Sequence, residues 1–297
     1  VYELAKKDKK ILFIGSDLGP GVLDDFKKNI PKRFFMEGVS EQSIIGLSAG
    51  LAMEGFKPYV NTIATFITRR CFEQLAIDLC LHNLPVKLIG NGGGLVYAPL
   101  GPTHQAIEDI SILRALPNMT IIAPCDAVEM KELVKQTSNY KGPIYIRLAR
   151  GGDKIITSSS ENLQLGKGNL KIKPEKHLFI TTGVMTQLAI EASKKIKKNK
   201  NINCGVIHLG TVKPLDKEIL LKWIPQVKKI VTVEENVLSG GFGSSILEFT
   251  NDHFPDHSNK ISRIGLKDAF IKQYGNQDLL FKSNNLTVEN LIKEILK

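Results

Sequence analysis

The sequence lacks the features that mark membrane, secreted and zinc-binding proteins. No apolar run reaches the roughly 18 residues that a helix needs to cross a bilayer. The first ten residues are lysine-rich and contain no apolar core of a signal peptide. CxxC and CxxxC spacings are absent, so we expect no zinc site and four free, buried thiols in a reducing cytoplasm. These thiols belong to Cys71, Cys80, Cys125 and Cys204.

The sequence also lacks the pattern of a nucleic-acid-binding protein, although it is basic. Lys and Arg number 40 against 30 Asp and Glu, a formal net charge of +10. Much of the charge lies in lysine clusters at residues 6–10 and 194–200, without interleaved arginines and aromatics. We interpret these clusters as solvated helix surface. The positive charge could otherwise attract an acidic partner subunit or a phosphorylated ligand.

Short apolar, β-branched runs alternate with helical stretches, which predicts parallel α/β architecture. The 297 residues suffice for two domains, each with its own core. Between them the sequence is polar and rich in Ser, Lys and Asn, which is typical of a linker. We predict two three-layer αβα domains with mostly parallel sheets, residues 1–155 and 177–297, joined by a linker over residues 156–176.

The expected elements follow from these runs. Strands are predicted at residues 11–14, 34–36, 59–63, 86–90, 120–123, 144–148, 178–181, 203–208 and 229–233. Helices are predicted at residues 41–54, 70–82, 107–115, 127–137, 185–195 and 217–223. The glycine-rich segment 240–243 opens a further helix, and we favour tight strand–helix packing over a phosphate site there.

Three stretches contain candidate functional residues. Glu41 begins a helix at the carboxyl edge of a predicted parallel sheet, where ligands bind; a first-turn residue favoured by the helix dipole is the structural alternative. Phe66, followed by Arg69 and Arg70, has the character of a stacking platform for a heteroaromatic ring, with core packing as its alternative. His104 lies on a loop after a run of glycines, which favours a functional role over a core histidine.

Together and in this order, these stretches resemble the pyrimidine-binding domain of transketolases and of the related deoxyxylulose-phosphate synthases. The later part is similar to the transketolase C-terminal domain, so the resemblance covers essentially the whole chain. The segments that carry it are EGVSEQ (37–42), TFITRRCFEQ (65–74), GPTHQAIEDISILRALPNMTIIAPCDAVE (101–129), TTGVMTQLAIEA (181–192), TVKPLD (211–216) and VTVEENVLSGGFGSSI (231–246).

The resemblance implies an enzyme subunit that transfers a two-carbon ketol unit between sugars with thiamine diphosphate. The family binds the diphosphate through Mg²⁺ on a separate N-terminal domain marked by Gly-Asp-Gly, and that tripeptide does not occur here. The chain therefore resembles the C-terminal subunit of a split transketolase. The N-terminal subunit would hold Mg²⁺ and most of the cofactor, in an α₂β₂ heterotetramer.

The resemblance also implies residue roles. Glu41 would hydrogen-bond N1′ of the cofactor pyrimidine and promote its imino tautomer, as suits a desolvated carboxyl. Phe66 would stack on the pyrimidine ring, and Arg70 would support the loop or a neighbouring carboxylate. His104 would face the substrate hydroxyls as a hydrogen-bond donor or proton relay. The cofactor supplies the carbanion chemistry, and the protein supplies orientation and electrostatics.

The sequence departs from transketolases around the substrate. Leu100 replaces the aspartate that reads the acceptor's α-hydroxyl, and a leucine forfeits roughly 1 to 3 kcal/mol of discrimination there. The family's phosphate-binding histidine and serine fall at Gly92 and near Gly21. Of the phosphate cluster only Arg150 persists, with Arg147 beside it. These changes predict an acceptor other than the standard aldose phosphate, such as a larger or nucleotide-linked sugar.

Two other functions remain open on the sequence. One is a deoxyxylulose-phosphate-synthase-like condensing subunit, which the FITRRCFEQ segment and the arginine pair also fit. The other is a non-catalytic structural subunit, although such a subunit has no chemical reason to keep Glu41, Phe66 and His104 together. A pyruvate or branched-chain dehydrogenase β-subunit shares the domain order but lacks the GPTHQ loop.

Overall fold

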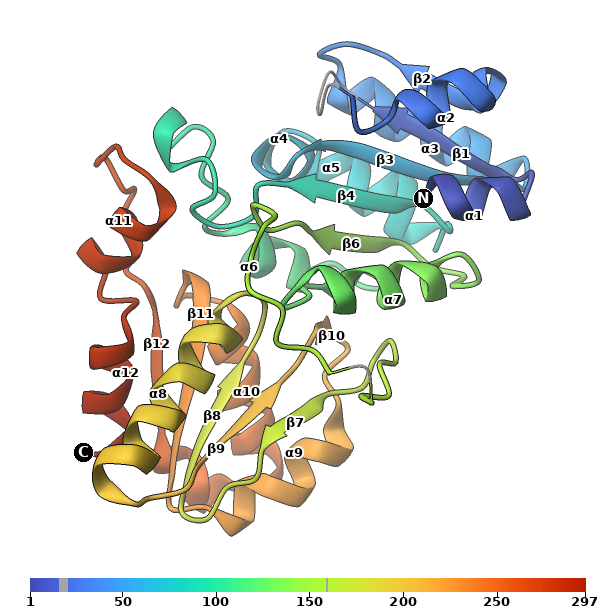
Figure 1. Cartoon of the computed structure of the whole chain (residues 1–297). Coiled ribbons are helices and arrows are strands. Elements are labelled where there is room, and N and C mark those ends of the chain that lie inside the picture. The colour runs from blue at the N-terminus through green and yellow to red at the C-terminus, as the bar shows by residue number, and fades with distance from the viewer. Residues whose placement is uncertain (16–20, 159) are drawn as a thin grey trace.

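The computed structural model describes residues 1–15, 21–158 and 160–297, and it contains two sheets with helices on both faces of each (Figure 1). The first sheet has the strand order β10-β5-β6-β4-β3-β1-β2, and the second has the order β12-β11-β8-β9-β7. Neighbouring strands are parallel except for β10 with β5 and β7 with β9. The predicted fold of two αβα domains with mostly parallel sheets is confirmed.

Both sheets are built from short strands. The first contains β1 (Ile11–Gly15), β2 (Phe34–Met36), β3 (Lys57–Ile63), β4 (Lys87–Asn91), β5 (Thr120–Ile122), β6 (Ile144–Arg147) and β10 (Thr211–Lys213). The second contains β7 (Asn169–Ile172), β8 (His177–Thr181), β9 (Cys204–His208), β11 (Lys229–Val237) and β12 (Ile261–Leu266).

The helices connect these strands and cover the sheets. They are α1 (Tyr2–Lys7), α2 (Asp24–Asn29), α3 (Glu41–Met53), α4 (Ala64–Arg69), α5 (Phe72–Gln74), α6 (Asp109–Arg114), α7 (Ala127–Thr137), α8 (Met185–Lys200), α9 (Lys217–Trp223), α10 (Phe242–His253), α11 (Gln277–Ser283) and α12 (Val288–Ile295). The chain also contains a π-helix, η2 (Leu75–Leu81), and the 3-10 helices η1 (Pro31–Arg33), η3 (Ala98–Leu100), η4 (Ile224–Gln226) and η5 (Pro255–Lys260).

Several details differ from the sequence-based expectations. The helix expected over residues 70–82 is interrupted, and the helical region starts earlier, with α4 at Ala64. The range 156–176, expected to be a linker, contains β7, which pairs with β9 at the edge of the second sheet. A polar edge strand of four residues carries no apolar run, so the pattern could not indicate it. Residues 16–20, expected in the loop after the first strand, lie outside the described residues.

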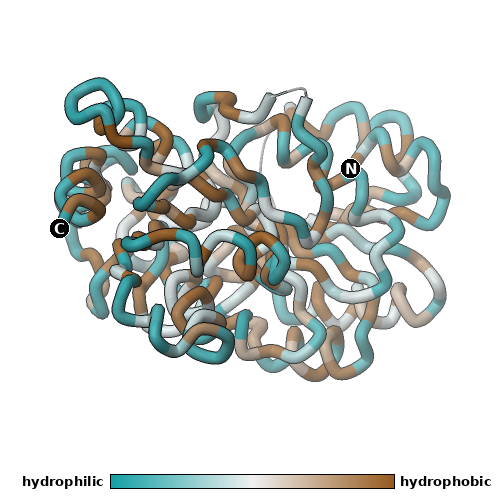
Figure 2. The backbone as a smooth tube through the Cα atoms, turned by 90° about the horizontal axis from the view of Figure 1, so that it is seen from below, coloured by the Kyte–Doolittle hydropathy of each residue, from teal (hydrophilic) through white to brown (hydrophobic). Residues whose placement is uncertain are grey.

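Apolar side chains fill both faces of both sheets, and in Figure 2 the apolar segments run through the middle of the molecule. Alternation along the strands sends neighbouring residues to opposite faces. In β8, for example, Phe179 packs toward α8 and α12, whereas Leu178 and Ile180 join the opposite core. That opposite core is continuous between the domains, since it contains residues from α3, α6, α9 and α10.

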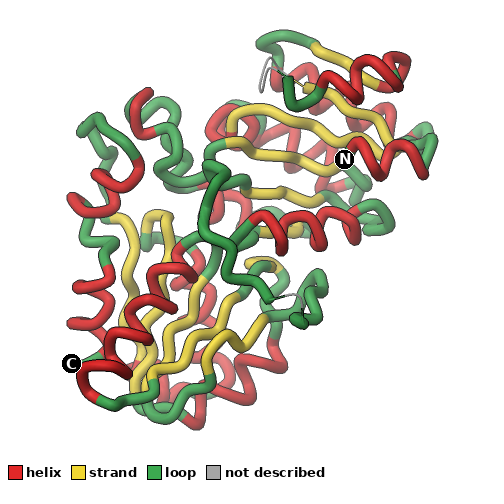
Figure 3. Tube along the Cα trace, viewed as in Figure 1, coloured by secondary structure: helices red, strands yellow, loops and turns green. Residues whose placement is uncertain are grey.

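The two domains are joined through a sheet as well as through this core. Strand β10 follows β9 in the sequence of the second domain but pairs with β5 at the edge of the first sheet. One buried polar contact crosses the same boundary, because His208 Nε2, on β9, lies 2.8 Å from Glu129 Oε2, on α7. The other ring nitrogen, Nδ1, lies 2.8 Å from Thr186 Oγ1 within the second domain. Figure 3 shows the long loop after β6 running along this junction.

Two expectations about composition can be compared with the structure. All four cysteines are free and buried, and burial raises the pKa of Cys71 and Cys204 to about 12. Within the described ranges, none of the helices combines the length and apolarity required to traverse a bilayer.

Candidate active site

The candidate site residues lie where the strands of the first sheet end. Glu41 follows β2, Phe66 follows β3, the loop with His104 follows β4, and Arg150 follows β6. These strands are parallel, so their carboxyl ends share one edge of the sheet. The topology therefore brings residues that are more than 100 positions apart to a single face.

Glu41 is the first residue of α3 and only 4% exposed. Its Oε2 accepts a hydrogen bond of 3.0 Å from Nη1 of Arg70. A buried carboxylate needs such a charged partner, because desolvation without one is costly. The helix N-terminus adds a second favourable interaction with the negative charge.

Phe66 lies between the other two candidates. The guanidinium carbon of Arg70 stands 4.1 Å from the centroid of its ring, and the His104 ring lies at 5.1 Å in an edge-on arrangement. Phe66 is partly buried and lies on α4, which begins directly after β3. Glu41, Arg70, Phe66 and His104 thus form one continuous group.

Arg69 connects α4 to the histidine, a role that sequence reasoning missed. Its guanidinium forms an ion pair with Glu108 and donates to the carbonyl oxygen of Gln105 at 2.9 Å. His104 itself is partly buried, and its Nδ1 lies 2.9 Å from Thr103 Oγ1. The two consecutive arginines have different partners, because Arg70 binds Glu41 whereas Arg69 binds Glu108.

These residues fit the pyrimidine half of thiamine diphosphate. A carboxylate, an aromatic ring and a histidine at one sheet edge match a planar, nitrogen-rich ring that is stacked and hydrogen-bonded. Nearby, Oγ1 of Thr65 and the side-chain amide of Gln105 are buried without a partner in the structure. Buried polar atoms of this kind normally have one, so the site favours a polar ligand.

One group of side chains in the described ranges has the spacing of a metal site: Cys125, Glu129 and His208. It lies at the domain junction, and both imidazole nitrogens are engaged by protein oxygens. Burial opposes ionisation of Glu129, but the charge and hydrogen bond of His208 lower the pKa of this carboxyl below its usual value. We interpret the group as a contact that holds the domains together.

Arg147 was expected to bind substrate, but its side chain is engaged within the protein. Its guanidinium is buried, where Nε donates to Asp109 Oδ2 at 2.8 Å and Nη2 donates to the backbone oxygens of Ala106 and Glu235. With its hydrogen-bonding groups turned inward, Arg147 is not placed to contact a phosphate. Sequence reasoning could not find this network, because its members are distant in the chain.

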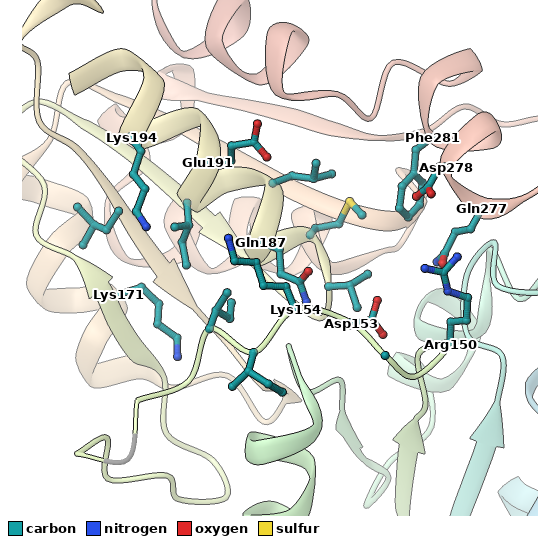
Figure 4. A pocket seen from close by; sticks show the side chains of 18 of the residues that line it. Arg150, Asp153, Lys154, Lys171, Gln187, Glu191, Lys194, Gln277, Asp278 and Phe281 are labelled. Atoms are coloured by element: carbon teal, nitrogen blue, oxygen red, sulfur yellow. The ribbon is translucent and has the colours of Figure 1, made fainter. Parts of the chain in front are cut away.

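Arg150 and Leu100 remain accessible. Arg150 lines a cavity of about 810 Å³ between the loop after β6 and helices α8 and α11, together with Lys154 and Gln277 (Figure 4). Leu100, on η3 in the loop before His104, is 51% exposed. The Arg150 side chain forms no hydrogen bond or ion pair with the described residues.

The glycine-rich segment 240–243 is a packing motif, as favoured from the sequence. Both oxygens of Glu234 accept backbone N–H groups of Phe242 and Gly243, at 2.7 and 2.8 Å. The carboxylate therefore takes the N-terminal amides of α10 that a phosphate would use. A side chain at Gly241 would overlap this carboxylate.

Comparisons with known proteins agree with this architecture. Residues 1–152 match the family model "Transketolase, pyrimidine binding domain", and residues 166–291 match "Transketolase, C-terminal domain". The chain belongs to the transketolase family, whose enzymes depend on thiamine diphosphate.

Among curated proteins, the chain is 39% identical over 299 residues to 1-deoxy-D-xylulose-5-phosphate synthase of Clostridium perfringens, with 100% of this chain and 48% of the relative covered. The same enzyme of Caldanaerobacter subterraneus is 39% identical over 297 residues, covering 99% of this chain and 47% of the relative. The chain thus spans about half the length of the curated relatives it matches.

The chain is also similar to solved structures, among them two transketolases. One is described as "Split gene transketolase, inactive beta4 tetramer", with a TM-score of 0.88 and 30% identity over 99% of this chain and 93% of that one. Transketolase from Campylobacter jejuni has a TM-score of 0.80 at 20% identity, covering 99% of this chain and 44% of that one, and supports the fold alone.

Proposed function

We propose that this chain is the C-terminal subunit of a split, thiamine-diphosphate-dependent transketolase that transfers a two-carbon ketol unit between sugars. The observation that carries the proposal is the contact of Phe66 with both His104 and the Arg70 bound to Glu41. A structural subunit would not need a buried carboxylate, a partly exposed aromatic ring and a histidine side by side.

The chain's residues have distinct tasks in this proposal. Glu41 holds the proton at N1′ of the pyrimidine, Phe66 orients the ring by stacking, and His104 donates to or relays protons from the substrate hydroxyls. The bound cofactor supplies the carbanion chemistry. Arg70 keeps the Glu41 carboxylate in place, and Arg150 offers an unpaired cation to an anionic substrate group.

A partner subunit carrying Mg²⁺ and the diphosphate site completes the proposal, as an α₂β₂ heterotetramer. An exposed apolar stripe supports an interface: Leu47 and Met53 on α3, and Ile77 and Leu81 on the adjacent η2, are exposed. Such a stripe on a monomer indicates an interaction surface. The similar split-gene protein forms a tetramer of β chains that is described as inactive.

A deoxyxylulose-phosphate-synthase-like condensation is the second candidate. The 39% identity to these synthases over the whole chain favours it. The two reactions differ in their donor, because the condensation releases CO₂ from a 2-keto acid, whereas ketol transfer does not. An atypical acceptor remains part of the proposal, because Leu100 stands where the family has the aspartate that binds the acceptor's α-hydroxyl.

Calorimetric titration of thiamine diphosphate and Mg²⁺ tests the proposal, first with this chain alone and then with the N-terminal subunit co-expressed. We expect binding only in the pair, and weaker binding in Glu41→Ala and Phe66→Ala. Tight binding to the lone chain would contradict the split site. The absence of binding in both samples would favour the non-catalytic structural subunit. An activity assay of the pair with a 2-keto acid donor separates the two enzymes, because CO₂ release would identify the condensing enzyme.

A further inference from the structure

The loop that carries His104, residues 92–106, is closed at its base within the first domain. Gly94 and Ala106 exchange two backbone hydrogen bonds of 3.0 and 2.9 Å, and the Gly93 N–H donates to the carbonyl oxygen of Leu148. The rest of this histidine loop projects from the first sheet toward α11 (Figure 1).

Apolar residues of the histidine loop belong to the core of the second domain. Leu95 and Ala98 are fully buried, and they lie in the same cluster as Phe179, Val233 and Leu280. This cluster is otherwise built from α8, α11, α12 and the strands of the second sheet, together with Ile107 just after the loop. Burial of such side chains stabilises the loop by the hydrophobic effect only while the second domain is in place.

Polar contacts reinforce this anchoring through one buried carboxylate. Glu235 Oε1, on β11, accepts the Leu95 N–H at 2.7 Å and Nε2 of Gln277 at 2.8 Å. Arg147 closes the other end of the loop, since its Nη2 donates to the Ala106 oxygen at 3.0 Å and to the Glu235 carbonyl at 2.9 Å. Glu235 therefore holds one end of the projecting segment, and Arg147, which is bound to Glu235, holds the other end.

Two glycines show how closely the loop approaches the second domain. Gly94 has a φ of +66°, and a Cβ there would overlap the Glu235 carboxylate. Gly101 has a φ of +76°, and a Cβ would lie 2.8 Å from the ring of Tyr274, in the segment before α11. Glycine is required at both positions by conformation and by space.

We propose that Glu235 and Tyr274, two residues of the C-terminal domain, are positioning residues that set the place of His104 at the active site. Neither contacts His104; they act through the backbone of the histidine loop, at Leu95 and Gly101. The relevance to catalysis rests on the proposed function, whereas the anchoring of the loop does not.

Hydrogen–deuterium exchange of the full chain tests the anchoring directly. In Glu235→Gln the charge facing Arg147 is lost, and we expect exchange in residues 92–106 to accelerate about tenfold. Tyr274 is 64% exposed, so Tyr274→Ala will fold even if Glu235→Gln does not, and we expect faster exchange around Gly101. Glu289→Gln, on the exposed face of α12, is the matched control and should leave the loop unchanged, because Glu289 pairs, among the described residues, only with Lys195 of its own domain.

Kinetics of the chain assembled with its partner test the positioning. We expect kcat to fall about tenfold in both variants, with the KM for thiamine diphosphate unchanged because Glu41 and Phe66 are untouched. Unchanged exchange in Tyr274→Ala and in folded Glu235→Gln would overturn the proposal, and so would faster exchange at full kcat. An inactive wild-type assembly would contradict the proposed function instead, and the exchange data would still decide whether the second domain holds the loop.

Discussion

The Arg70 guanidinium donates to the Glu41 carboxylate at 3.0 Å, and its central carbon lies over the Phe66 ring, 4.1 Å from the ring centroid. A planar group that lies over the phenylalanine ring and is hydrogen-bonded to the glutamate contacts the same two residues that we propose for the pyrimidine. The two residues that would recognise the cofactor are thus already oriented toward one planar, cationic partner. This relationship makes the following predictions specific to each side chain.

Replacing Glu41 with Ala should reduce cofactor-dependent activity at least about 100-fold, because a positioned acid–base group contributes about 10² to 10⁴ in rate. Steady-state kinetics of the assembled enzyme measures this loss. Glu54→Gln, at the exposed end of the same helix, is the control and should keep full activity. Equal effects of the two substitutions would mean that Glu41 acts only through the stability of α3.

Replacing Phe66 with Ala should weaken the binding of thiamine diphosphate about tenfold, because stacking on an aromatic ring contributes about 0.5 to 1.5 kcal/mol beyond the area it buries. Phe66→Tyr keeps the ring and should bind nearly as well as wild type. Calorimetry of both variants with the partner subunit checks this prediction. A Tyr variant as weak as the Ala variant would argue against stacking.

His104→Asn should lower kcat about 100-fold and leave the affinity for the cofactor unchanged, since His104 is proposed to act on the substrate. The exposed His82 provides a matched control in His82→Asn. Parallel measurement of kcat and of cofactor binding separates the two effects. A loss of cofactor affinity in His104→Asn would place this histidine against the pyrimidine.

Leu100→Asp should shift the acceptor preference toward small aldose phosphates with a free α-hydroxyl. A restored hydrogen bond to a hydroxyl contributes roughly 1 to 3 kcal/mol of discrimination, about 5- to 150-fold in relative kcat/KM. Competition between two acceptors measures the ratio. A variant with an unchanged ratio would show that position 100 does not contact the acceptor.

The stability of the protein should fall as the pH rises toward 8 because of Glu234. Burial raises the pKa of this carboxyl from 4.5 to about 8, although two backbone N–H groups oppose the change. Between these values the folded protein keeps a proton that the unfolded chain releases, so the free energy of unfolding decreases with pH. Urea denaturation from pH 5 to 8 should show the decline in wild type and a flatter profile in Glu234→Gln.

The parts of the fold that the sequence could predict are those determined by local pattern. Apolar runs such as residues 11–14 and 178–181 coincide with β1 and β8. Phe66 and His104, which the family resemblance assigned to one site, lie with their rings 5.1 Å apart. Strand β10 was missed, because its pairing partner β5 lies about 90 residues earlier, in the other domain.

Arg147 shows why part of the site could not be predicted. Arg147 is the last residue of β6, whereas Arg150 lies in the loop just after this strand and is exposed. Only the fold places Asp109 and Glu235 around Arg147, from positions 38 and 88 residues away. Residues that are distant in the chain therefore decide whether a charged residue at a strand end contacts a ligand or forms an ion pair within the protein.

The pairing of β10 with β5 also limits how this chain can be divided. A protease cut or a genetic junction between residues 152 and 166, where the two family models meet, would interrupt the covalent chain without freeing either half. The first sheet would still hold a strand of the second domain at its edge, and the shared core would still bridge the two pieces. The two family domains therefore form a single mechanical unit.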